Sequence, residues 1–154
     1  MSVYISLVGK KKLLDKLESI EKEITETYRL MGESTKVDND LRENPEYLEL
    51  QTKISYKLPL ERSKVKEILN NSLVIEEQEF YKLFNGEEVI IGSKVTLIYD
   101  NAEEIYHIVG EGEEDPFNNI ISYKCDFAFN LIGKKINEEF KYKNANIKVI
   151  KIEV

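Results

Sequence analysis

The sequence is poor in several residue types, and each shortage excludes a class of protein. Its single cysteine, Cys125, excludes an internal disulfide framework and a cysteine-based zinc cluster, and it fits a reducing cytoplasm, where we expect the protein. Because His107 is the only histidine, no Ser-His-Asp or Cys-His catalytic set can be assembled. We interpret His107 as an exposed strand residue and Cys125 as a small buried hydrophobe.

Long apolar runs are also missing. No stretch approaches the roughly 18–20 apolar residues that a membrane span needs, so we expect no membrane partner. At the start of the chain, the basic residues follow a very short apolar stretch. In a secretory signal they precede a longer one, so we expect no signal peptide.

Positive charge is scarce in the second half of the chain. Residues 1–75 hold 13 Lys/Arg and 13 Asp/Glu, whereas residues 76–154 hold 9 and 16, which gives the net charge of −7. A protein that binds DNA by itself is disfavoured, because phosphate binding draws its affinity from a basic surface. The acidic half favours a basic protein partner instead.

Apolar spacing in the first half predicts two helices. Steps of three and four residues, typical of helix-on-helix packing, connect Leu13, Leu14, Leu17, Ile20, Ile24, Tyr28 and Met31. After the loop signal "GESTKVDNDLRENP", a second stripe comprises Tyr47, Leu48, Leu50, Ile54, Leu58, Val65, Ile68 and Leu69. The pattern predicts an antiparallel coiled-coil hairpin over residues 1–76, with a kink or short break at Pro59.

The second half changes to a strand pattern. The segments "VIIGSKVTLIYD", "EEIYHIVG" and "NIKVIKIEV" alternate or are β-branched, and turn signals at Asn85-Gly86, Gly110 and Asn144 bound them. "DFAFNLIGKK" predicts one short helix with a glycine at its C-terminal cap. Residues 77–154 are therefore expected to form a small antiparallel sheet with one short helix, and the whole chain belongs to the α+β class.

An acidic cluster lies between the two predicted helices. Asp40 and Glu43 stand three apart, with Asp38 beside them. One interpretation is a capping box, with Asp40 as N-cap, followed by a second cap at Asn44-Pro45. The other is a pair of exposed carboxylates that help to hold a divalent cation, which requires further ligands from elsewhere because two carboxylates bind Mg²⁺ weakly.

The chain resembles a specific family in several places along its length. "DLRENPEYLEL" is similar to the tip motif of the bacterial transcript-cleavage factors of the GreA/GreB family, in which an Asp-x-x-Glu-Asn-x-Glu-Tyr run joins two long helices. "LNNSLVIEE" resembles the end of that family's second helix. "NGEEVIIGSKVTL", "YHIVGEGEED" and "IISYKCDFAFNLIGKK" resemble its C-terminal FKBP-like domain in order and spacing.

The resemblance implies a factor that works inside another enzyme. The hairpin of such a factor enters the secondary channel of RNA polymerase. There the tip carboxylates, Asp40 and Glu43, help to hold a Mg²⁺ ion shared with the polymerase active centre and position the attacking water. The polymerase then cleaves the backtracked nascent RNA near its 3′ end and resumes elongation, so we expect no enzyme activity and no bound cofactor in the isolated protein.

Further roles follow from the resemblance as expectations, together with a monomeric state. The residues expected to support the tip are Asn44, Glu46 and Tyr47. The basic residues expected to face RNA are Lys36, Arg42 and Lys53. The loop expected to bind the polymerase comprises Tyr123, Lys124, Cys125 and Asp126.

The chain departs from the family pattern at Cys125-Asp126, at Gln51 and at Pro59, which interrupts the second helix. Cys125-Asp126 stands where members usually carry Ser-Pro, and Gln51 stands where a basic residue is frequent, which favours GreA-like behaviour with short cleavage products. Asp38 adds an acid to the tip. Because some Gre-like paralogues with highly acidic tips inhibit polymerase, a secondary-channel inhibitor without cleavage activity is the alternative hypothesis. A scaffold unconnected with polymerase, in which the acids are only caps, is the third.

Overall fold

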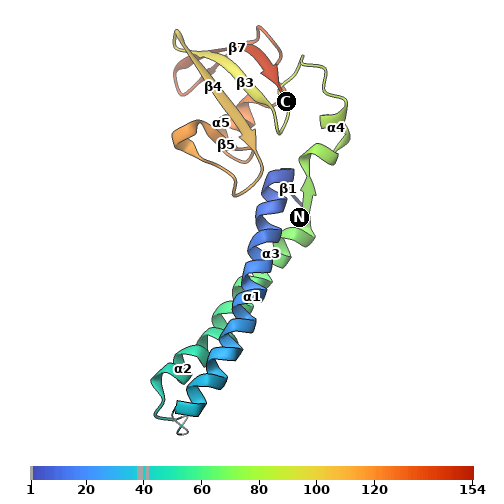
Figure 1. Ribbon diagram of the computed structural model, residues 1–154. Coiled ribbons are helices and arrows are strands. Elements are labelled where there is room, and N and C mark those ends of the chain that lie inside the picture. Colours follow the sequence, from blue (N-terminus) through green and yellow to red (C-terminus); the bar gives the residue numbers. More distant parts are fainter. Residues whose placement is uncertain (1, 38–39, 41) are drawn as a thin grey trace. The chain divides into compact units, whose positions relative to one another are not determined.

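The chain folds into two compact units, shown in Figure 1. The computed structural model describes residues 2–37, 40 and 42–154. Residues 11–71 form one unit, the hairpin unit, and residues 1–10 together with 72–154 form the other, the sheet unit. The predicted α+β class is confirmed. The sequence pattern predicts a hairpin over residues 1–76, but packing places residues 1–10 and 72–76 of that range in the sheet unit.

The elements follow one another in a simple order. The hairpin unit contains most of α1 (Leu7–Val37), followed by α2 (Pro45–Thr52), a π-helical turn (Lys53–Lys57) and α3 (Leu58–Asn71). The sheet unit contains β1 (Val3–Ile5), β2 (Ser72–Val74), a 3-10 turn (Ile75–Glu77), α4 (Glu79–Lys82), β3 (Lys94–Tyr99), β4 (Ala102–Val109), a 3-10 turn (Pro116–Asn118), β5 (Ile120–Ser122), α5 (Asp126–Leu131), β6 (Glu139–Tyr142) and β7 (Ala145–Glu153). Among the described residues, no helix has the length and apolar character that crossing a membrane requires.

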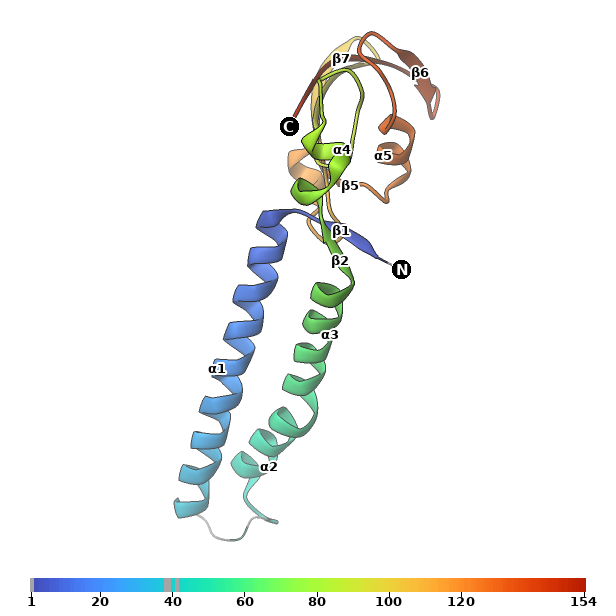
Figure 2. The same cartoon turned by 90° about the vertical axis from the view of Figure 1, so that its right-hand side faces the viewer.

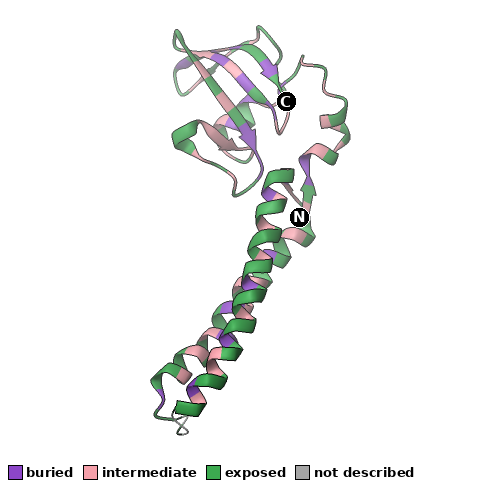
Figure 3. Cartoon of the chain, in the orientation of Figure 1, coloured by how far each residue is buried: buried purple, intermediate pink, exposed green. Residues whose placement is uncertain are grey.

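The predicted helical hairpin is confirmed, but its buried seam differs from the predicted stripes at several positions. Figure 2 shows α1 beside the segment formed by α2 and α3, and Figure 3 shows buried positions recurring along both. Tyr28, expected in the seam, is 61% exposed, and Thr27 is 1% exposed in its place. Leu14, Leu48 and Ile68, also expected in the stripes, are exposed. The seam residues that match the predicted stripes are Leu13, Leu17, Ile20, Ile24, Met31, Ile54, Leu58, Val65 and Leu69.

The predicted loop between the helices is shorter than expected. Residues 32–37, interpreted as loop because they include glycine, serine and threonine, continue α1 to Val37. Asp38 lies outside the described residues. Since Ser34 is buried, packing against the second helix outweighs the weak helix propensity of these residues.

Pro59 changes the helix type instead of breaking the helix. Residues 53–57 form a π-helical turn, in which the N–H of Leu58 donates to the carbonyl of Lys53, five residues earlier. Proline has no N–H to donate and its ring clashes with the carbonyl four residues before it. The wider π-helical turn opens the backbone at this point, so that helical structure continues from Pro45 to Asn71.

The sheet has five strands in the order β5-β4-β3-β7-β6. The pairs of β3 with β4, β3 with β7 and β6 with β7 are antiparallel, as predicted, but β5 pairs parallel to β4, so the sheet is mixed. The predicted turn at Asn144 is confirmed: Lys143 and Asn144 both have positive φ and connect β6 to β7. Gly133, with φ of +88°, follows the last turn of α5, as expected for a helix-terminating glycine.

A core of aliphatic side chains lies between the sheet and α5. Ala128 and Leu131 of α5 are fully buried against the strands, and the ring of Phe127 contacts those of Tyr99, Tyr106 and Tyr142. The strand residues of this core are Val95, Leu97, Ile108, Ile147, Val149 and Ile152.

The first residues of the chain are integrated into the sheet unit. β1 pairs parallel to β2, with Val3 opposite Ser72, and the carbonyl of Tyr4 accepts from the N–H of Glu111 at 3.0 Å. Neither contact is predicted by the sequence pattern.

Two carboxylates cap the beginning of α1. The N–H of Ser6 donates to Glu113 Oε2 at 2.9 Å, the Ser6 hydroxyl also bonds to Glu113, and the N–H of Leu7 donates to Glu76 Oε2 at 2.9 Å. The first turn of α1 contains no acidic residue of its own. The carboxylates of Glu113 and Glu76 therefore supply the negative charge that a helix N-terminus favours.

A substitution at Gly110 tests how closely β1 packs against the rest of the sheet unit. A Cβ at this buried position would lie 2.6 Å from Ile5 Cα and 2.6 Å from the Tyr4 carbonyl oxygen, both backbone atoms. We expect Gly110→Ala to lower the free energy of unfolding by roughly 1–3 kcal/mol, because β1 must move. The midpoint of urea unfolding, followed by circular dichroism, measures this.

Gly32→Ala is the matched control. Gly32 is helical and a Cβ there meets nothing within 4 Å, so the same substitution is expected to stabilise by up to about 1 kcal/mol. An unchanged midpoint for Gly110→Ala would show that β1 does not pack as described.

Candidate functional site

The candidate site is the turn that carries Asp40 and Glu43. The N–H of Arg42 donates to Asp40 Oδ1 at 3.1 Å, and the N–H of Glu43 donates to the carbonyl of Asp40 at 3.2 Å. Asp40 therefore caps a turn and not a helix, and the capping-box interpretation is wrong because α2 begins only at Pro45. Both acidic residues are exposed to solvent.

Asn44 connects this turn to both helices. Its Oδ1 accepts from the N–H of Tyr47 at 3.0 Å, so that it caps α2, with Pro45 next to it as predicted. Its Nδ2 donates to the carbonyl and the hydroxyl of Ser34 in α1, at 3.3 and 3.0 Å. One buried amide thus satisfies a donor at the start of α2 and an acceptor in the last turn of α1.

The other residues expected at the tip differ in their surroundings. Glu46 is exposed in the first turn of α2, where a negative charge is favourable, and Tyr47 is half-buried. Lys36 lies exposed in the last turn of α1, and Arg42 is also exposed. Lys53 forms an ion pair with Glu23 of α1, with 2.5 Å between Nζ and Oε1, so its charge is engaged within the hairpin.

Residues 123–125 lie directly before α5, and Asp126 is its first residue. The hydroxyl of Tyr123 accepts from the N–H of Tyr4 at 3.2 Å, and the two rings meet edge to face. Lys124 Nζ lies 2.7 Å from Glu111 Oε2, and this hydrogen bond raises the pKa of the Lys124 ammonium. Asp126 is exposed at the first position of α5.

Cys125 serves as the N-cap of α5. Its Sγ accepts from the N–H of Ala128 at 3.4 Å, and the residue is half-buried, so the prediction of a buried hydrophobe was only partly correct. His107 is exposed in β4, as predicted. The aromatic side chain of Phe129 on α5 is 77% exposed, which the apolar character of this helix does not predict.

The described residues do not form a metal site by themselves. No group of three or more His, Cys, Asp or Glu side chains among the described residues is placed to hold a metal ion. Asp40 and Glu43 offer oxygen ligands of the kind that Mg²⁺ prefers, but too few for a site of their own.

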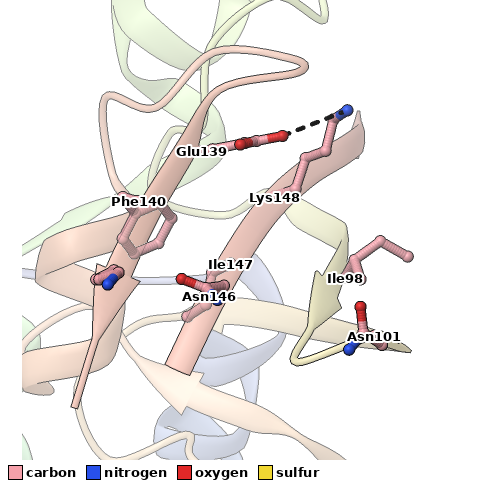
Figure 4. Close-up of a pocket in the computed structure, with 8 residues that line it drawn as sticks. Ile98, Asn101, Glu139, Phe140, Asn146, Ile147 and Lys148 are labelled. Atoms are coloured by element: carbon pink, nitrogen blue, oxygen red, sulfur yellow. Dashed lines mark ion pairs between the residues drawn. The ribbon is translucent and has the colours of Figure 1, made fainter. Parts of the chain in front are cut away.

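A shallow hollow of about 550 Å³ lies on the sheet unit, shown in Figure 4. Its walls come from β3, β6, β7 and the turn after β3, and Glu139 and Lys148 form an ion pair with 3.6 Å between Nζ and Oε1. The other lining residues are Ile98, Asn101, Phe140, Lys141, Asn146 and Ile147, which do not form a recognisable set of catalytic groups.

Comparisons with known proteins place this geometry in a family. Residues 85–154 match the model of the C-terminal part of the transcription elongation factors GreA/GreB. Transcription elongation factor GreA of Clostridium acetobutylicum is 34% identical over 143 residues, covering 89% of this chain and 85% of that protein. GreA of Bacillus subtilis is 30% identical, with coverage of 94% and 92%. The chain belongs to the GreA/GreB family of transcription elongation factors.

A solved structure is also similar over the full length of the chain. It is the GreA factor homolog 1 (Gfh1) protein of Thermus thermophilus, with 16% identity and a TM-score of 0.43, covering 100% of both chains.

Substitutions of Cys125 test whether its sulfur acts as the N-cap of α5. Removing the sulfur in Cys125→Ala leaves the N–H of Ala128 without its cap, and we expect the free energy of unfolding of the sheet unit to fall by about 1 kcal/mol. Cys125→Ser is expected to retain or raise stability, because a hydroxyl is the stronger N-cap. Thermal unfolding of the two variants, measured in parallel, checks this order. If Ala and Ser are equally stable, the sulfur does not act as a cap.

Proposed function

We propose that this protein stimulates transcript cleavage by RNA polymerase. In this proposal the hairpin enters the secondary channel of the enzyme, and Asp40 and Glu43 act at its active centre on backtracked nascent RNA. The proposal rests on two exposed acidic residues, Asp40 and Glu43, in a turn that Asn44 connects to both helices by hydrogen bonds. Membership of the GreA/GreB family supports it.

The exposure of the two acids fits a shared site. A carboxylate pair that worked within this chain would be expected in a cleft with further ligands or bases, whereas Asp40 and Glu43 lie in solvent. In the proposed complex they would add ligands to a Mg²⁺ ion of the polymerase, which supplies charge stabilisation at the phosphoryl group and an activated water. The chain itself presents the two carboxylates and holds their turn in shape.

The remaining surface has two proposed roles. Lys36 and Arg42 are the tip cations that the structure leaves exposed, and they are proposed to face the RNA. Since Lys53 is paired with Glu23, the positive surface at the tip is small, which favours GreA-like cleavage with short products. Residues 123–126 are proposed to dock on the polymerase, with Asp126 and Lys124 exposed.

Isosteric variants of the two acids test the proposal. Asp40→Asn retains an oxygen for the N–H of Arg42, and Glu43→Gln leaves the backbone turn untouched, so both should fold normally. We expect each to lower the cleavage rate of stalled, backtracked complexes with 3′-labelled RNA by on the order of 100-fold, as the loss of a few kcal/mol at the transition state predicts. Competition with labelled wild type should show unchanged binding to the polymerase.

The matched control is Glu49→Gln, which removes an exposed carboxylate from α2 outside the turn and should cleave like the wild type. Strong residual cleavage by Asp40→Asn or Glu43→Gln would overturn the assignment. If the wild type yields no fragments but slows nucleotide addition, the inhibitor hypothesis, motivated by Cys125-Asp126 and Asp38, replaces the cleavage proposal.

A further inference from the structure

Two hydroxyl residues occupy the buried seam of α1. The seam positions follow steps of four and three residues without interruption: Leu13, Leu17, Ile20, Ile24, Thr27, Met31 and Ser34. Thr27 is 1% exposed and Ser34 is 3% exposed. A polar group at such a position is costly unless it finds a hydrogen-bond partner.

The two hydroxyls find different partners. Thr27 Oγ1 donates to the carbonyl of Glu23, one turn earlier in its own helix, at 2.7 Å. Ser34 Oγ instead accepts from Nδ2 of Asn44 at 3.0 Å and donates to Oδ1 of the same amide at 3.3 Å. Ser34 therefore directs its hydroxyl across the hairpin, ten residues along the chain.

The bond from Nδ2 of Asn44 to the Ser34 hydroxyl is 3.0 Å long. The other contact from Nδ2, to the Ser34 carbonyl, is longer at 3.3 Å. Asn44 in turn holds the N–H of Tyr47 at the start of α2. Asn44, which directly follows Glu43, is therefore hydrogen-bonded both to Ser34 in α1 and to Tyr47 in α2.

We propose that Ser34 is a positioning residue for the acid pair, a role that rests on the proposed cleavage function. Its hydroxyl fixes the amide of Asn44, and the amide fixes the ends of the segment that carries Asp40 and Glu43. Without the hydroxyl, Asn44 loses its 3.0 Å contact with Ser34 and keeps the longer bond from Nδ2 to the Ser34 carbonyl, so we expect the turn to sample more positions. Small displacements of groups that must meet a reacting centre reduce its rate strongly.

The experiment compares Ser34→Ala with Thr27→Val. Both remove a buried hydroxyl from the same seam, but only Ser34 contacts Asn44. Cleavage of stalled complexes is measured over a range of factor concentrations. Ser34→Ala is expected to lower the rate at saturating factor by about 10-fold, with the half-saturating concentration unchanged within about twofold, since the docking surface is untouched. Thr27→Val is expected to keep the wild-type saturating rate.

Amide hydrogen exchange of the isolated factor provides a second readout. The N–H of Tyr47 is bonded to Asn44 and should exchange faster in Ser34→Ala than in the wild type, whereas Thr27→Val should leave it unchanged. Asn44→Asp keeps an N-cap oxygen and an acceptor for the Ser34 hydroxyl but loses the Nδ2 donor, so its cleavage loss should be smaller than that of Ser34→Ala.

These readouts separate the two proposals. Wild-type saturating cleavage by Ser34→Ala overturns the positioning role, and so does a defect confined to the half-saturating concentration. If the wild-type factor itself cleaves nothing, the cleavage proposal fails, and the exchange of Tyr47 then decides whether Ser34 fixes the tip: unchanged exchange in Ser34→Ala overturns that as well, and faster exchange supports it.

Discussion

The geometry of the hairpin tip depends on one buried amide. Asn44 donates to Ser34 in α1 and accepts from the N–H of Tyr47 in α2, so it satisfies groups at two helix ends that would otherwise lack partners. A side chain with both donor and acceptor atoms is needed for this, because a helix C-terminus offers carbonyls and a helix N-terminus offers N–H groups. The segment between the helices can therefore be short and still carry two exposed acids.

Exposed carboxylates at a fixed position suit a protein that completes another protein's site. Because both carboxylates are exposed, they remain hydrated and water weakens their repulsion, so holding two like charges on one turn costs the free factor little stability. The opposite end of α1 shows the contrasting use of acids. Glu113 and Glu76 are there engaged with N–H groups of the first turn, where they stabilise the fold.

Much of this fold can be predicted from the sequence, because periodicity reports burial directly. The hairpin and the strands β3, β4 and β7 follow from periodicity, and the cap at Asn44-Pro45 follows from the residues that helix starts prefer. Thr27 and Ser34 were missed because a polar residue in a seam position looks like surface, although the steps of three and four include both. The pairing of β1 with β2 was missed because three residues show no period and the partner is distant in sequence. The role of Asp40 as a turn cap depends on local dihedral angles that spacing does not encode.

If Asp40 and Glu43 add ligands to a metal ion of the polymerase, as proposed, the Mg²⁺ dependence of transcript cleavage must change when the factor binds. Stalled complexes are titrated with Mg²⁺ alone, with wild-type factor and with Asp40→Asn, all at saturating factor. We expect the wild type to lower the half-saturating Mg²⁺ concentration by about 10-fold. Asp40→Asn should leave this concentration at the value of the polymerase alone. The same half-saturating concentration with the wild type and with Asp40→Asn would contradict this proposal.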